Sequence, residues 1–185
     1  MKKVLAILAM ATLSSGAFAA SATIEYQNKN GVDGTTDTNQ YQLSVKENFN
    51  DNFAGDVTLN SSVKDTTGAV SNSRAELGLT GSASFGGIVT PYIRVATGNK
   101  FTTTKDFGYY SVEPGVTAPI GNTGLTARLA YRYRDAYGSD TDLTRTWRAG
   151  LSYNLTKKDT IGVRYDRERG DSNNNIWAVN YTRGF

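Results

Sequence analysis

Residues 125–134 of the chain read LTARLAYRYR. Every second side chain from Leu125 to Tyr133 is apolar or aromatic, and the side chains that alternate with them include three arginines. Successive side chains of a β-strand point to opposite faces, so this period of two predicts a strand with one apolar and one charged face. A soluble core would need apolar side chains where these arginines stand. The stretch therefore predicts a strand that separates an apolar environment from a charged one.

The same alternation recurs in nine further segments, separated by stretches rich in Gly, Asn, Asp and Ser. These segments begin near Ala22, Tyr41, Val57, Arg74, Val89, Tyr110, Trp147, Ile161 and Trp177. The spacing of roughly 16 to 17 residues suits membrane strands of about ten residues with their connections. We predict an all-β fold: a transmembrane, antiparallel, up-and-down β-barrel of ten strands in a single domain. Barrels of eight or twelve strands stay open as alternatives.

Two prolines fall inside predicted strands. Pro91 and Pro114 each remove a backbone donor from the hydrogen-bond ladder. The Pro114-Gly115 dipeptide is therefore a candidate β-bulge.

The N-terminal residues have the pattern of an export signal. Lys2 and Lys3 precede a short apolar run, and Ala17-Phe18-Ala19 forms a cleavage site of the A-x-A type. The apolar run is too short to span a bilayer. We expect residues 1–19 to be a cleaved signal peptide and residues 20–185 to form the barrel domain.

Composition excludes several classes of function. The chain has no Cys and no His, which excludes thiolate and imidazole catalysis and the common zinc sites. Apolar residues make up 38% and the mean hydropathy is −0.43, too polar for a bundle of transmembrane helices. Without the two signal lysines, 18 basic and 17 acidic residues leave a net charge of +1. We therefore expect no metal, no cofactor and no nucleic-acid partner.

Aromatic residues on the apolar face favour a membrane barrel over a soluble β-sandwich or ligand-binding barrel, since aromatic girdles mark both membrane interfaces. The predicted girdle residues are Tyr131, Tyr133, Trp147, Tyr153, Tyr165, Trp177 and Tyr181. The chain ends on Phe185, with Tyr181 on the same face. This terminus resembles the signal read by the outer-membrane assembly machinery of Gram-negative bacteria, although Arg183 departs from the usual apolar residue.

The mature chain as a whole thus resembles Gram-negative outer-membrane β-barrel proteins. The resemblance implies location in the outer membrane, contact with membrane lipid and lipopolysaccharide, delivery by the assembly machinery, and a monomer. Outer-membrane enzymes of this size rely on a histidine, so we expect no enzymatic activity.

The charged face predicts the lining of the barrel. Nine basic and six acidic side chains on that face give a net charge of +3. The residues we select for the lumen are Glu76, Arg94, Glu113, Arg128, Arg132, Arg148 and Arg164. In one hypothesis these arginines draw small anionic solutes through a narrow channel. In the other, ion pairs such as Arg94–Glu113–Arg128 and Arg164–Asp166 plug the barrel.

Two segments are similar to the oligogalacturonate-specific porin family: Val112-Glu113-Pro114-Gly115 and Ala130-Tyr131-Arg132-Tyr133-Arg134. That family has an arginine-lined lumen, which the resemblance implies here as well. It also has twelve strands, two more than we count, so its substrate is not carried over.

Overall fold

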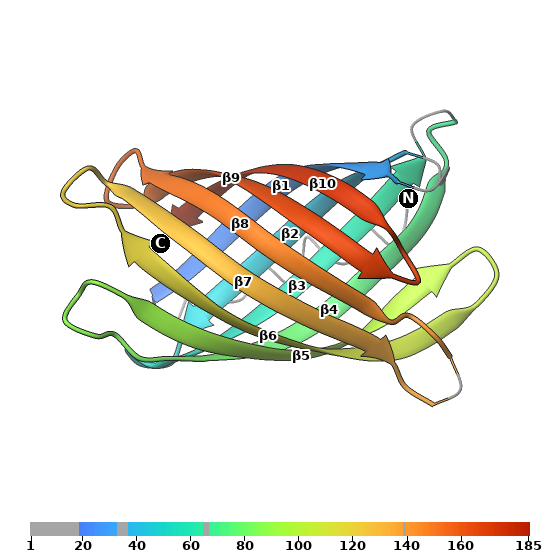
Figure 1. Cartoon of the computed structure of the whole chain (residues 1–185), viewed down its shortest axis with the longest axis horizontal. Coiled ribbons are helices and arrows are strands. Elements are labelled where there is room, and N and C mark those ends of the chain that lie inside the picture. Colours follow the sequence, from blue (N-terminus) through green and yellow to red (C-terminus); the bar gives the residue numbers. More distant parts are fainter. Residues whose placement is uncertain (1–18, 33–36, 65–66, 139) are drawn as a thin grey trace.

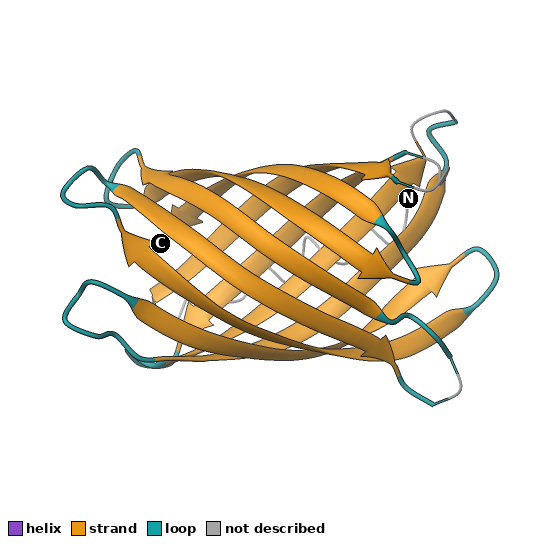
Figure 2. Cartoon of the chain, viewed as in Figure 1, coloured by secondary structure: helices purple, strands orange, loops and turns teal. Residues whose placement is uncertain are grey.

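The computed structural model describes residues 19–32, 37–64, 67–138 and 140–185, and within them ten strands form a closed barrel (Figures 1 and 2). The strands are β1 (Ala19–Gly31), β2 (Thr38–Asn48), β3 (Phe53–Lys64), β4 (Val70–Ser82), β5 (Thr90–Thr102), β6 (Asp106–Pro119), β7 (Leu125–Ala136), β8 (Thr144–Asn154), β9 (Asp159–Gly170) and β10 (Asn174–Gly184). No helix in these residues is long and apolar enough to span a membrane.

Each strand pairs antiparallel with the next along the chain, and β1 pairs with β10 to close the barrel. The predicted up-and-down barrel of ten strands is therefore confirmed. Ser21 lies opposite Gly184, so β1 begins where β10 ends. We call this the terminal end, which lies at the left of Figure 1, and the opposite one the far end. The predicted signal peptide lies outside the described residues except for Ala19, with which β1 begins.

The barrel buries its polar side chains and exposes its apolar ones. Leu77, Val179 and Ile24 are 61%, 58% and 59% exposed, whereas Glu113 and Asp166 are each 1% exposed. A soluble protein has the opposite arrangement. The outward apolar surface suits lipid, and the polar lining suits water, as in membrane barrels.

The aromatic residues predicted as girdles lie on the outward face in two groups. Toward the far end, neighbouring strands place their rings in contact. The ring centroids of Tyr131 and Trp147 are 5.0 Å apart, and those of Tyr165 and Trp177 are 4.9 Å apart. Together with Tyr133 these residues form what we call the far belt.

Tyr153 and Tyr181 lie nearer the terminal end, on β8 and β10. Phe185 follows directly after β10, where its backbone N–H donates to the Ala20 carbonyl at 3.0 Å and its side chain is 71% exposed. The roles of these residues as a girdle and as an assembly signal remain predictions.

The two prolines do not produce the expected bulge. Val112 pairs with Tyr133 and Gly115 pairs with Ala130 in the same register, so the β6–β7 ladder lapses at Glu113 and Pro114 without an inserted residue. The lapse is consistent with the missing proline donor. A register shift occurs instead between Ser62 and Val63, where β3 pairs with β4.

Candidate functional site

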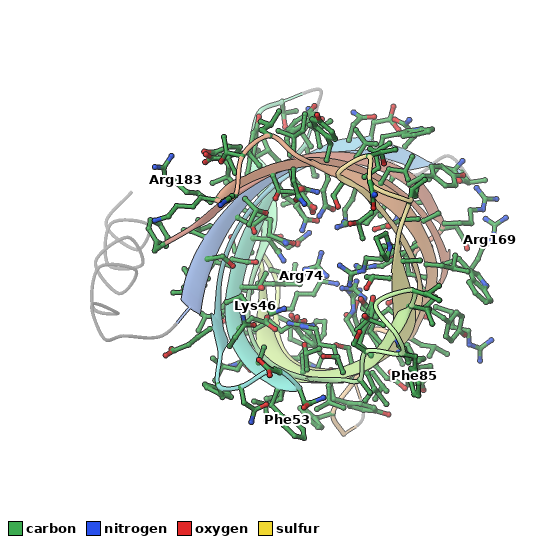
Figure 3. The ribbon with its side chains drawn as sticks, turned by 90° about the vertical axis from the view of Figure 1, so that its left-hand side faces the viewer. Lys46, Phe53, Arg74, Phe85, Arg169 and Arg183 are labelled. Atoms are coloured by element: carbon green, nitrogen blue, oxygen red, sulfur yellow. The ribbon has the colours of Figure 1, made fainter. Side chains whose placement is uncertain are left out.

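The seven residues selected from the sequence all lie on the inward face, contributed by strands β4 to β9. Figure 3 looks into the barrel from the terminal end and shows polar side chains such as Lys46 and Arg74 reaching into the lumen. Figure 3 also shows Phe53, Phe85 and Arg183 pointing away from it. The alternation of the strands therefore determines which side chains face the lumen.

Arg94 forms the centre of the first ion-pair cluster. Its guanidinium donates to both oxygens of Asp56, from Nε at 2.9 Å and from Nη2 at 2.6 Å. The same Nη2 lies 2.7 Å from Glu76 Oε1. The Tyr109 hydroxyl donates to the other Glu76 oxygen at 3.0 Å. This fork-to-carboxylate geometry satisfies both carboxylates and holds the guanidinium against the wall.

Glu113 forms the centre of the second cluster. Its carboxylate lies 2.6 Å from Arg128 Nη2 and 2.7 Å from Arg148 Nη1. The Tyr92 hydroxyl donates to Glu113 Oε1 at 3.3 Å and accepts from Arg128 Nε at 2.7 Å. Of the predicted ion pairs Arg94–Glu113 and Glu113–Arg128, the second is present and the first is wrong. Arg94 lies opposite Glu113 in register but turns toward the two carboxylates of β3 and β4.

Arg164 forms the third cluster, and its predicted pair with Asp166 is present at 2.8 Å. Its Nη1 also lies 2.8 Å from Glu25 Oε2 on β1. Arg148 Nε lies 3.6 Å from Asp166 Oδ2, which connects the second cluster to the third. The three clusters together extend around most of the inner wall, from Asp56 on β3 to Glu25 on β1.

The ion pairs between strands follow the wall rather than cross the lumen. Within the described residues, each such pair joins strands that are adjacent or separated by one strand, as with Arg148 of β8 and Glu113 of β6. Such pairs fasten neighbouring side chains together. They do not by themselves bridge the opposite sides of the barrel.

Four inward cations of the described residues form no ion pair with a carboxylate. They are Lys29, Lys46, Arg74 and Arg132. Arg74 donates instead to the neutral oxygens of Asn60 at 3.2 Å and Gln40 at 3.1 Å. The buried Nε of Arg132 has no hydrogen-bond partner among the described residues.

Three of these cations line one small polar hollow inside the barrel. The charged side chains around it are Lys29, Arg74, Arg132, Arg148, Asp166 and Glu168. Amide side chains such as Gln27 and Gln42 complete much of its wall. Four cations face two carboxylates here, so the hollow has a net charge of +2 and donors suited to an anion.

Sequence reasoning placed Arg132 in the site but selected neither Arg74, Lys29 nor Lys46, although it counted them on the charged face. Their distinction is that no described carboxylate lies within the 4.0 Å that defines an ion pair, which depends on packing between distant strands. The alternation pattern holds no signal for it.

Asp142 lies in the connection between β7 and β8, and its side chain is buried rather than solvated. It is 3% exposed, and its carboxylate lies 2.7 Å from both Lys100 Nζ and Arg134 Nε. Asp142 thus folds against the inner wall at the far end. Counting Lys100 and Asp142, the described inward face has ten basic and seven acidic side chains, again a net charge of +3.

The described residues contain no group of three or more acidic side chains that could hold a metal ion.

A closed barrel with an apolar exterior, an aromatic belt and a charged, polar lining defines the class of outer-membrane β-barrel channels. A family model described as "Gram-negative porin" matches residues 8–173. The chain therefore belongs to the Gram-negative porin family, and is a non-enzymatic channel protein of the outer membrane. A search of curated protein sequences found no match.

Solved structures with a similar fold include three outer-membrane barrels at low sequence identity. The COG4313 outer membrane channel from Pseudomonas putida F1 has a TM-score of 0.57 at 11% identity, with 93% of this chain and 97% of that chain covered. The β domain of the Bordetella autotransporter BrkA has a TM-score of 0.53 at 12% identity, covering 92% and 100%. The KdgM porin in complex with disordered oligogalacturonate has a TM-score of 0.52 at 12% identity, covering 88% and 99%. These likenesses support the fold.

Proposed function

We propose that the protein is a diffusion channel with a modest preference for small anionic solutes. The observation that carries the proposal is the set of four inward cations without a carboxylate partner, Lys29, Lys46, Arg74 and Arg132. Cations whose charge is already neutralised by a carboxylate contribute little field at a distance. Unpaired cations in a narrow, low-dielectric passage attract anions and repel cations.

The proposal changes which residues carry the selectivity. Arg94, Arg128, Arg148 and Arg164 were selected from the sequence as an arginine wall, but each lies within 2.8 Å of a carboxylate oxygen. We assign these four to holding the inner wall in place. Arg132, which lines the hollow without such a partner, is the selected arginine that we expect to act on the permeating ion.

A plugged barrel without channel activity is the competing function. Its support is the same dense pairing of charges on the inner wall. The positions of the ion pairs favour the channel. They join strands that are close together in the wall, and a polar hollow lies inside the barrel. Conductance of the folded protein separates the two.

The proposal is tested by comparing the ion selectivity of Arg132→Glu with that of the unchanged protein in planar bilayers. The substitution lowers the net charge of the described inward face from +3 to +1 and places a carboxylate at the hollow. We expect the preference for anions to weaken or reverse while conductance persists. Arg183→Glu is the matched control, since Arg183 points outward at the terminal end and is expected to leave selectivity unchanged. An unchanged selectivity of a conducting Arg132→Glu channel contradicts the proposal.

A further inference from the structure

Three arginines on the outside of the barrel form a separate cluster at the far end. They are Arg145 of β8 and Arg167 and Arg169 of β9, and we call them the outer arginine cluster. Arg145 and Arg169 are exposed, and Arg167 is half-buried. Figure 3 shows Arg169 projecting away from the barrel wall. The inward positions beside them are buried, for example Thr144 at 0% and Glu168 at 3% exposure.

The register of β8 and β9 brings these like charges together. Arg145 lies directly opposite Arg169, and Trp147 lies directly opposite Arg167. The Cβ atoms of directly opposed residues are about 4.5–5.5 Å apart, and like charges at that spacing destabilise the pair. Within the described residues, none of the three guanidinium groups has a carboxylate within the 4.0 Å that defines an ion pair. The cluster therefore concentrates three positive charges that the described protein does not neutralise.

Arg183, another outward arginine, is arranged differently. It lies near the terminal end, where its Nη1 is 3.2 Å from Asp159 Oδ1. The fold thus supplies a carboxylate to that arginine but none to the outer cluster. The described protein therefore leaves these three guanidinium groups available to a negative charge from outside the protein.

The position of the cluster identifies the source of that charge. Trp147 and the other rings of the far belt lie beside it, and aromatic belts sit at the level of the lipid headgroups. The Arg167 guanidinium donates to Asn175 Oδ1, which also accepts from the Tyr165 hydroxyl at 2.9 Å. Arg167 is thereby held beside the far belt. A guanidinium fork matches the oxygens of a phosphate group in two parallel hydrogen bonds.

We propose that the outer arginine cluster binds the phosphate group of an anionic lipid headgroup in the surrounding membrane. A phosphate between Arg145 and Arg169 would convert their repulsion into two attractions. Arg167 would add a third contact from the next outward position of β9. The site is separate from the lumen, so it goes beyond the proposed channel function.

The test measures quenching of Trp147 by lipids with brominated acyl chains. Folded protein carrying Trp177→Phe, so that Trp147 is its single tryptophan, is placed in neutral detergent and titrated with brominated phosphatidylglycerol or brominated phosphatidylcholine. We expect phosphatidylglycerol to quench at a lower mole fraction, because its net negative charge meets three arginines. Neutral phosphatidylcholine measures contact with lipid in general.

Combined replacement of Arg145, Arg167 and Arg169 by Gln is expected to abolish this preference. Each cation near an anionic surface contributes about fivefold to binding, so the three together give a loss of about 100-fold. Arg183→Gln is the control and keeps the preference. If the triple variant fails to show the heat-modifiable gel mobility of a folded barrel, Arg169→Gln alone is used, with an expected loss of about fivefold.

Three results would overturn the proposal. The first is equal quenching by the two lipids in the protein with intact arginines. The second is an unchanged preference for phosphatidylglycerol in the folded arginine variant. The third is displacement of the lipid by low concentrations of inorganic phosphate, which would make the cluster a site for soluble anions.

Discussion

The Glu113 carboxylate on β6 lies 2.7 Å from Arg148 Nη1 on β8, across the intervening strand β7. The same carboxylate lies 2.6 Å from Arg128 Nη2 on β7, so one acid fastens three consecutive strands on their inner side. Glu113 is 1% exposed, so its buried carboxylate depends on these two arginines to balance its charge. The arginines around Glu113 are therefore part of an ion-paired inner wall. The inward cations without an ion pair are other residues, such as Arg74 and Arg132.

We expect Glu113→Gln to destabilise the barrel. The change leaves Arg128 and Arg148 without this carboxylate, and breaking a buried pair costs about 3 kcal/mol or more. Because water in the lumen would solvate the two arginines, we expect the loss of folding stability to lie near about 3 kcal/mol. Urea unfolding in lipid vesicles, followed by gel mobility, measures it, and Glu47→Gln is the control because Glu47 has no ion pair among the described residues. A loss equal to that of the control would show that the Glu113 pairs do not stabilise the wall.

Gly115 is expected to resist substitution because of Tyr92. A Cβ atom added at Gly115 would lie 2.4 Å from the Tyr92 ring. Gly115→Ala should therefore displace the ring, disturb its contacts with Arg128 and Glu113, and cost about 1–3 kcal/mol. The decisive comparison is the same substitution in a Tyr92→Ala background, where the cost should largely vanish. An equal cost in both backgrounds would place its origin in the backbone rather than in Tyr92.

Much of the fold follows from local pattern. The alternation in residues 125–134 places Arg132 inward and Tyr131 outward, because a strand has only two faces, and the structure has this arrangement. The number of strands also follows, since each alternating segment is bounded by turn residues. Because the number of antiparallel strands is even, the start of β1 and the end of β10 lie at the same end of the barrel.

The pairing of charges could not be predicted in the same way. Arg94 lies opposite Glu113 on the neighbouring strand, yet its long side chain turns to Asp56 and Glu76 on the other side. Asp142 lies in a connection where no periodicity applies, and it folds inward to Lys100 and Arg134. Both outcomes depend on side-chain packing among strands far apart in sequence. Alternation specifies a face but not a partner.

The two tryptophans provide a test of the membrane orientation. Trp147 and Trp177 are 57% and 58% exposed on the outward face, both in the far belt. In vesicles we expect their fluorescence to be quenched by brominated lipid and protected from iodide in water, because both rings would contact acyl chains near the headgroups. Strong quenching by iodide together with none by brominated lipid would contradict the assigned outer surface.

The β7–β8 connection should loosen when Asp142 loses its charge. Asp142→Asn removes the carboxylate shared by Lys100 and Arg134, and we expect faster chymotrypsin cleavage after Tyr137. Asp140→Asn is the matched control in the same connection, since Asp140 pairs with Lys105, whose side chain is 62% exposed. Exposed pairs contribute about 0–1 kcal/mol, so this control should change cleavage little. Equal cleavage of both variants would mean that Asp142 does not hold the connection.

The central claim is that unpaired lumen cations make the protein an anion-preferring channel, and the reversal potential of the unchanged protein tests it most directly. The folded mature barrel is inserted in a planar bilayer between two concentrations of potassium chloride. We predict discrete conductance steps whose reversal potential has the sign of the chloride equilibrium potential. A reversal potential with the sign of the potassium equilibrium potential would contradict the claim, as would the absence of conductance from a barrel shown to be folded.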